Sequence, residues 1–152
     1  MRIDLNRANE HARQMQLQSD SLHDARSLLH SIQGDLRSNW RGPEMENISA
    51  SINNMLTRLA TLANEAASIA ADIPPAAQEI RRQEDLADAR IVLAREDSNV
   101  ANLRRNLENA QRQHSINPTP ATQSELNRAQ GNLNNAIHTR NNAAAQVQSL
   151  MR

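Results

Sequence analysis

Hydrophobic side chains recur at helical spacing along nearly the whole chain. Between residues 44 and 73 they are separated by alternating steps of three and four, the pattern of a helix that packs against another helix. The positions are Met45, Ile48, Ile52, Met55, Leu59, Leu62, Ala66, Ile69 and Ile73. Similar stripes run from Leu86 to His114 and from Leu126 to Leu150. These stripes predict an all-α chain built from long helices.

Helix-breaking residues are confined to three places, at Gly42-Pro43, Pro74-Pro75 and Pro118-Thr119-Pro120. Because proline disrupts a helix interior, these breaks predict four helices that form two antiparallel hairpins. The first hairpin would span residues 1–73 with its turn at 40–43. The second would span residues 76–152 with its turn at 117–121. The two hairpins would form either an elongated molecule or one four-helix bundle.

Two helix starts carry their own signals in the sequence. Asp4 is a good N-cap for the first helix, which we expect to end near Asn39. Thr122 and Glu125 have the spacing of a capping box, which places the start of the last helix near Thr122.

A turn at Gly42 would bring apolar residues of the first two helices face to face. The expected pairs include Leu36 with Ile48, Ile32 with Ile52 and Leu22 with Leu62. The second helix carries another stripe beside this seam, formed by Leu56, Ala60, Ala63, Ala67 and Ala70. Because a helix that is apolar on two sides usually contacts more than one neighbour, we expect these five residues to bind a partner.

The second hairpin has an equally regular predicted seam. Leu103 would face Leu133, and Leu86 would face Leu150. Each helix of this hairpin has a single charged residue in its stripe, Glu96 in one and Arg140 in the other. The expected register places these two opposite each other, so we predict a Glu96–Arg140 pair that sets the register.

Composition narrows the possible functions. The 152 residues contain no cysteine, a single aromatic residue (Trp40), 17 basic and 17 acidic residues, and a net charge of +0. No cysteine, lysine, metal-binding histidine motif or phosphate-binding loop is available for chemistry, and long thin hairpins offer no pocket. We therefore expect no enzymatic activity, metal, cofactor or small-molecule substrate.

The balanced charge argues against nucleic-acid binding. We also expect neither a cleavable signal peptide nor a membrane span.

The only tryptophan of the chain lies in the predicted turn, in the sequence Trp40-Arg41-Gly42. One explanation is structural: the indole covers the end of the hairpin core, and the glycine supplies a left-handed backbone angle. That explanation would suit any helical hairpin.

The combination of two amphipathic helices with a W-x-G turn near residue forty resembles the WXG (ESAT-like) proteins of bacterial type VII secretion. The resemblance covers about residues 1–80, and Trp40 and Gly42 match the family motif in residue and position. It implies a non-enzymatic protein that forms four-helix assemblies as a homodimer or heterodimer. It also implies that Trp40 and Gly42 are part of a secretion signal.

Two departures from the family pattern refine what the resemblance implies. The chain has no tyrosine, so the Tyr-x-x-x-Asp/Glu tail signal of the family is missing and export would rely on a partner. The extra C-terminal hairpin is similar to the accessory partners of LXG toxins. The leading hypothesis is thus a bacterial adaptor or targeting factor, cytoplasmic or exported with its cargo, that binds the helical N-terminal domain of a larger effector or another WXG-like protein. The alternatives are a self-sufficient, secreted homodimeric substrate and a cytoplasmic coiled-coil scaffold unrelated to secretion.

Overall fold

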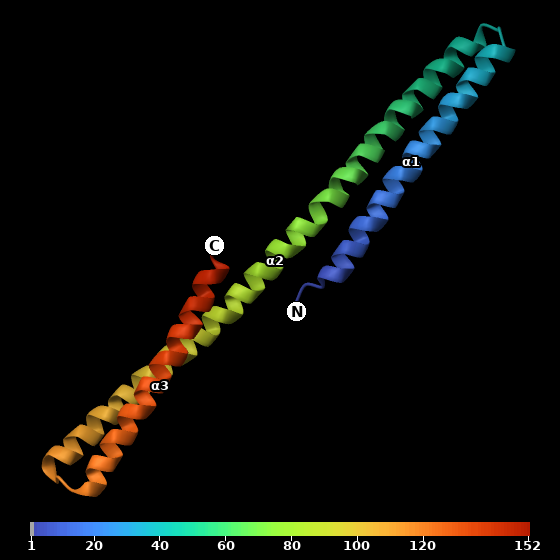
Figure 1. Cartoon of the computed structure of the whole chain (residues 1–152). Helices are drawn as coiled ribbons and strands as arrows, with labels where there is room; N and C mark the ends of the chain where they lie inside the picture. The colour runs from blue at the N-terminus through green and yellow to red at the C-terminus, as the bar shows by residue number, and fades with distance from the viewer. Residues whose placement is uncertain (1) are drawn as a thin grey trace. The chain divides into compact units, whose positions relative to one another are not determined.

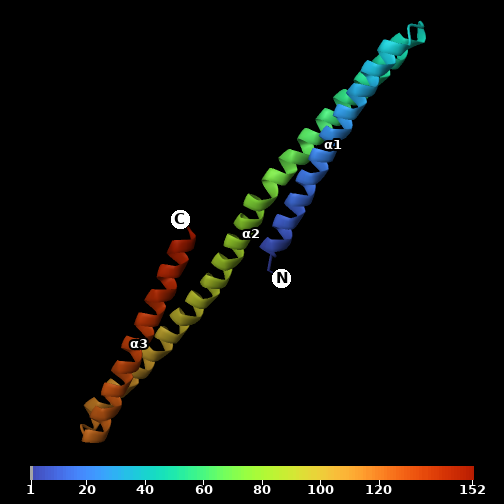
Figure 2. The same ribbon diagram turned by 45° about the vertical axis from the view of Figure 1, so that its right-hand side comes forward.

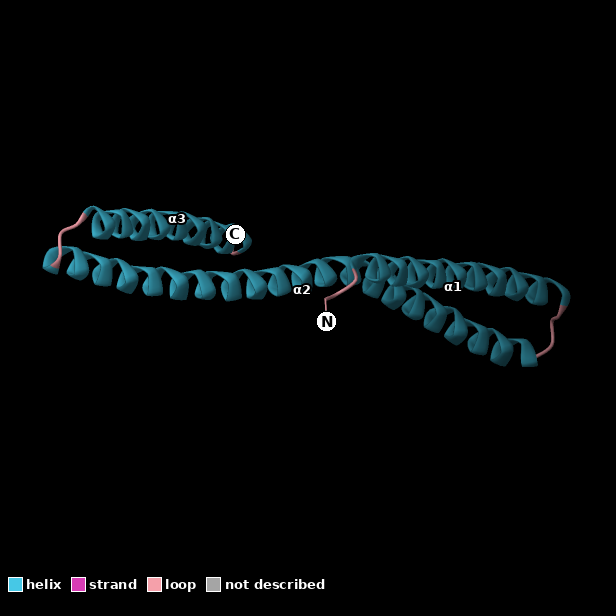
Figure 3. Ribbon diagram, turned by 90° about the horizontal axis from the view of Figure 1, so that it is seen from below, coloured by secondary structure: helices cyan, strands magenta, loops and turns pink. Residues whose placement is uncertain are grey.

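The computed structural model describes residues 2–152 and confirms the all-α class (Figure 1). Over these residues there are three helices, namely α1 (Leu5–Asn39), α2 (Glu44–Ile116) and α3 (Pro120–Leu150). The expectation of four helices is wrong at one place, because α2 continues without interruption where a break was predicted. Figure 3 shows the two loops that follow α1 and α2.

The chain divides into two compact units, residues 1–81 and 82–152. In the first unit, α1 lies antiparallel to the N-terminal part of α2, as Figures 1 and 2 both show. We call this the first helix pair. In the second unit, α3 lies antiparallel to the C-terminal part of α2, and we call this the second helix pair.

Pro74 and Pro75 lie inside α2, where the sequence predicted a helix boundary. A proline in a helix interior removes one backbone hydrogen bond and crowds the carbonyl four residues earlier, at a cost of about 3 kcal/mol or more. The helix is held on both sides of this site, since Ala70 and Ala77 are both buried. Alanine also has the highest helix propensity, so the flanking residues favour continuation. Packing and local propensity together thus offset the effect of the two prolines.

The helix ends are capped by side chains. The Asp4 carboxylate accepts hydrogen bonds from the backbone N–H groups of Asn6 and Arg7, as its N-cap prediction requires. At the start of α3 the N-cap is Thr119, three residues before the predicted capping residue Thr122. Thr119 and Thr122 form a reciprocal capping box, and Pro120 occupies the first helical turn, where its missing N–H is harmless. The predicted partner Glu125 is exposed and takes no part in this cap.

The seam of the second helix pair follows its predicted stripes. One buried cluster joins Leu86 and Ala89 of α2 to Val147 of α3, with Leu150 packed against it. A second cluster joins Val100 of α2 to Leu133 and Ala136 of α3. Large side chains here face small ones, which lets the two helices approach closely.

Candidate functional site

The first helix pair has the predicted lengthwise register but a rotated interface. The Ser19 hydroxyl donates to the backbone oxygen of Ala63 at 2.9 Å, and the Gln33 amide donates to that of Ser49 at 3.3 Å. These contacts match the register that places Leu36 opposite Ile48. The buried α1 residues, however, are Ala12, Ser19 and Gln33, each one position after a residue expected in the seam. About half of the predicted positions remain in the interface, since Met45, Ile52 and Ala66 of α2 are buried, so both helices are turned by less than one residue relative to the prediction.

On α2 the same rotation displaces only part of the predicted seam, while Met45, Ile52 and Ala66 of that seam stay buried. Ala63 is 0% exposed and Ala70 is 7% exposed, while Leu56, Ala60 and Ala67 are half-buried. The five residues expected to bind a partner therefore lie in or beside the chain's own seam, which corrects that expectation. Met55, Leu62 and Ile69, which were expected in the seam, are 54%, 51% and 49% exposed.

The rotation has a physical basis in residue size and polarity. Serine and alanine at Ser19 and Ala63 allow the two backbones to approach, and a hydrogen bond then satisfies the buried hydroxyl. Near the turn, Gln33 also donates to the Asn53 side chain at 2.9 Å, and the Arg37 guanidinium donates to the Ser49 hydroxyl at 3.2 Å. None of the buried side-chain polar atoms among residues 2–152 lacks a partner.

The large apolar residues displaced from the seam gather on one side of the first helix pair. Met55, Leu62 and Ile69 each precede a core residue of α2, and Ile32 precedes the core residue Gln33 of α1. In two antiparallel helices, residues that precede the core position lie on the same side of the seam. Leu28, one turn before Ile32, is 64% exposed and extends this surface. We call these five residues the apolar face.

A shallow hollow lies on the surface of α1. It has a volume of about 460 Å³ and is lined by Leu17, Gln18, Ser21 and Leu22. Leu17 is itself exposed, and Leu22 lies near Leu62 in the register of this pair. Leu17 and Ser21 are each two residues from the buried Ser19, so much of this hollow opens on the side of α1 that faces away from the seam.

The predicted W-x-G turn links α1 to α2. Trp40 is the C-cap of α1 and is 44% exposed, so its indole is not part of a closed core. Its backbone N–H donates to the Leu36 carbonyl at 2.9 Å, and the Met45 N–H donates to the Gly42 carbonyl at 3.1 Å. Among residues 2–152, no residue has a positive φ. Gly42 therefore does not supply the left-handed backbone angle considered above.

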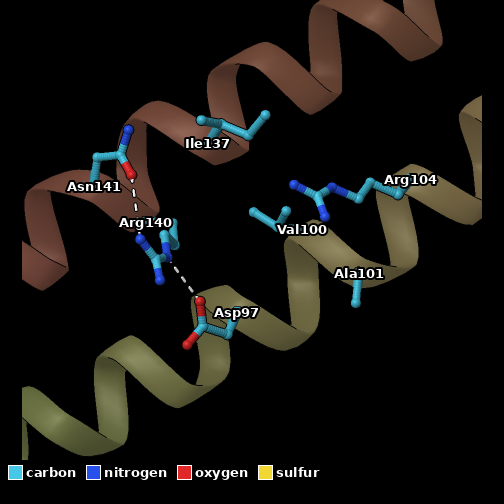
Figure 4. Close-up of a pocket in the computed structure, with 7 residues that line it drawn as sticks. All are labelled: Asp97, Val100, Ala101, Arg104, Ile137, Arg140 and Asn141. Carbon is cyan, nitrogen blue, oxygen red and sulfur yellow. Dashed lines mark hydrogen bonds and ion pairs between the residues drawn. The ribbon is translucent and has the colours of Figure 1, made fainter.

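The predicted Glu96–Arg140 pair is replaced by two separate ion pairs in the second helix pair. Arg140 Nε donates to Asp97 Oδ1 at 2.8 Å, one residue beyond Glu96 (Figure 4). Glu96 is buried and is paired with the neighbouring Arg95 at 3.2 Å. The Arg140 side chain thus reaches the exposed carboxylate at the side of the seam, since a charge pair there keeps its contact with water.

Asp97 and Arg140 form one wall of a groove of about 350 Å³ between α2 and α3. Val100 and Ile137 form its apolar part, and the Arg104 side chain lies beside them (Figure 4). The groove holds no set of groups that could act together as nucleophile, base and oxyanion site.

Other classes of site are not found in the described part of the chain. No group of three or more His, Asp or Glu side chains within residues 2–152 could hold a metal ion. Over the same residues, no helix is both long enough and apolar enough to cross a membrane. No protein-family model, curated protein or solved structure matches the chain.

Proposed function

We propose that this chain is an adaptor of bacterial type VII secretion that binds the helical domain of a larger effector and helps to direct its export. The observation that carries the proposal is the apolar face, where large side chains are left exposed while small ones form the seam. The W-x-G resemblance at Trp40 and Gly42 supplies the link to secretion. On this proposal the protein is not an enzyme and needs no cofactor.

The periodicity of α2 indicates what kind of partner would cover the apolar face. Between residues 55 and 75 its apolar residues occupy four of every seven positions, for example Leu62, Ala63, Ala66 and Ala67. Such a broad stripe is typical of helices in bundles of more than two, whereas a two-helix coiled coil needs only two positions in seven. The partner proposed here is therefore one or two amphipathic helices that lie along the first helix pair.

The apolar face is smaller than a standard protein interface. Residues 55–69 of α2 span about 20 Å, and two helices side by side are about 20 Å wide. The resulting area of about 400 Å² is half of the roughly 800 Å² that each partner contributes to a standard interface, so the proposed partner would also contact polar residues along the first helix pair.

Affinity purification from the host bacterium tests the proposal, with cells and medium analysed separately. Leu62→Asp places a charge in the centre of the apolar face, and Ile91→Asp is the matched control because Ile91 is 69% exposed on the second unit. We expect the wild type and Ile91→Asp to recover a larger protein with a helical N-terminal domain, and Leu62→Asp to lose it. The proposal fails if Leu62→Asp retains that protein, or if the wild type is found only in cells without an effector or secretion component.

A second candidate is the secreted homodimer, and one arrangement of charges favours it. Arg58 and Glu65 are exposed on α2 and lie on either side of Leu62. If two copies of α2 pair antiparallel about Leu62, Met55 meets Ile69 of the second copy. Arg58 then lies within one residue of the position opposite Glu65 of the second copy, which its long side chain can reach, and each pair occurs twice.

Charge reversal separates this candidate from the adaptor. Arg58→Glu and Glu65→Arg should each weaken a homodimer, because each creates two like-charge contacts. A mixture of the two variants should dimerise again, since both contacts become attractive. The measurement is molar mass by light scattering after size exclusion. A wild-type monomer, or a mixture that stays monomeric, contradicts the homodimer and leaves the adaptor proposal unaffected.

A further inference from the structure

The seam of the first helix pair is interrupted at one layer. One series of core positions in each helix recurs every seven residues, at Ala12, Ser19, Arg26 and Gln33 on α1 and at Ser49, Leu56, Ala63 and Ala70 on α2. All of these residues are buried except Arg26, which is exposed, and Leu56, which is half-buried. The register that joins Ser19 to Ala63 also places Arg26 opposite Leu56. The two exceptions therefore belong to the same layer.

A notch of about 240 Å³ opens at this layer. It is lined by Arg26, Ser27, His30 and Leu56, and we call it the Arg26 notch. A guanidinium has no partner inside an apolar seam, so its burial would be costly and the side chain stays at the surface. Ser27 follows a core position, whereas the residues of the apolar face precede core positions. The notch therefore opens on the side of the seam opposite to the apolar face.

The lining of the notch offers hydrogen-bond donors and no carboxylate. Arg26 and His30 are one helical turn apart on α1, and among residues 2–152 neither side chain has a hydrogen-bond or ion-pair partner. The Ser27 hydroxyl donates to the His23 carbonyl at 3.0 Å, so its proton is already engaged. Asp24 is the acidic residue nearest to Arg26 in the sequence, but two residues along a helix place it on the opposite side of α1.

From this arrangement we propose that the Arg26 notch binds the carboxylate of a small aliphatic acid. The guanidinium presents parallel N–H groups that match a carboxylate, and the imidazole N–H of His30 supplies another donor. Leu56 provides an apolar wall for a short hydrocarbon chain. Pockets for drug-sized ligands measure roughly 300–1,000 Å³, so this smaller notch suits an acid of only a few carbons. Its ligand and the partner of the apolar face would occupy separate surfaces.

Titration of the purified protein with sodium 3-methylbutanoate tests the site, with amide signals followed by nuclear magnetic resonance at constant ionic strength. We expect saturable shifts at residues 26–30 and at Leu56. Arg26→Gln removes the charge at similar length and should weaken binding at least tenfold. Arg13→Gln is the matched control and should bind as the wild type does, because Arg13 is exposed on α1 and is not part of the notch. Shifts that rise linearly with concentration, or that persist in Arg26→Gln, would overturn the proposal.

Inorganic phosphate, used as a second probe, tests the class of ligand. Because phosphate gains nothing from the apolar wall at Leu56, it should bind more weakly than 3-methylbutanoate at the same ionic strength. Tighter binding of phosphate would contradict a site for an aliphatic acid.

The variant Arg26→Leu tests whether the notch arises from the interrupted seam. A leucine at this core position can cover Leu56, so the melting temperature should rise while binding of 3-methylbutanoate is lost. An unchanged or lower melting temperature would show that residue 26 is not a core position, and the structural basis of the proposed site would fail.

Discussion

Leu62 and Ala63 of α2 give the sharpest test of which residues form the seam of the first helix pair. Ala63 is completely buried, and its backbone carbonyl accepts a hydrogen bond from Ser19. Leu62 is half exposed on the apolar face. Ala63→Leu should therefore destabilise the isolated chain, and Leu62→Ala should barely affect it. The rotation predicted from sequence alone would require the opposite result.

The magnitudes follow from the burial of each side chain. Ala63→Leu forces three additional carbons into a seam with no free surface, which costs about 1–3 kcal/mol. Leu62→Ala removes a side chain that is about half buried, at a cost of about 1 kcal/mol. The higher helix propensity of alanine offsets a few tenths of a kcal/mol of that loss.

The assay is thermal unfolding followed by circular dichroism at the helical band. In a chain of this size each kcal/mol lowers the midpoint by about 2–4 °C. Ala71→Leu, at an exposed position of the same helix, controls for the change in helix propensity. A larger drop for Leu62→Ala than for Ala63→Leu would refute the assigned seam and, with it, the apolar face.

Three further predictions concern local interactions, and the same melting experiment measures each. Replacing Arg140 by alanine should cost no more than about 1 kcal/mol, because its ion pair with Asp97 is half exposed; a larger loss would show that the pair does more than fix register. Replacing Pro74 and Pro75 together by alanine should raise the melting temperature, since each proline breaks the hydrogen-bonding pattern of α2, and an unchanged or lower midpoint would contradict this. Thr119→Ala should destabilise α3 by about 1 kcal/mol through loss of its capping box, whereas no change would mean that the cap is dispensable.

The two helix pairs differ in how far their sequence determines their packing. In the second pair, Leu86, Val100 and Leu133 have no large apolar neighbour next to them in the sequence, so spacing alone assigns them to the seam. In the first pair, α2 has apolar residues at adjacent positions such as Leu62 and Ala63. Hydrophobicity favours the larger residue, whereas close backbone approach favours the smaller one. Periodicity alone cannot rank these two effects.

The polar residues of the first seam hold the information that the hydrophobic pattern lacks. Ser19 and Gln33 look like surface positions in a sequence, yet both are buried with hydrogen-bond partners on α2. Ala12, Ser19 and Gln33 are separated by multiples of seven residues, and this spacing could have indicated the buried side of α1. The neighbouring stripe through Ile32 is more apolar, however, so hydrophobicity favoured it instead. The same ambiguity explains the misplaced partner surface, because a small error of rotation exchanges neighbours such as Leu62 and Ala63 between the exposed and buried sides of α2.

Trp40 and Gly42 show a different limit of sequence reasoning. The spacing of these residues identifies the turn, but it suggests that glycine is present for a left-handed backbone, which the structure contradicts. The close approach of Nε1 gives the actual reason, since the side chain two residues earlier occupies the space of a β-carbon. A W-x-G turn built this way is one unit, in which the ring and the residue beneath it cannot vary independently. This coupling is why a larger residue at position 42 should displace the indole while the helices on either side remain folded.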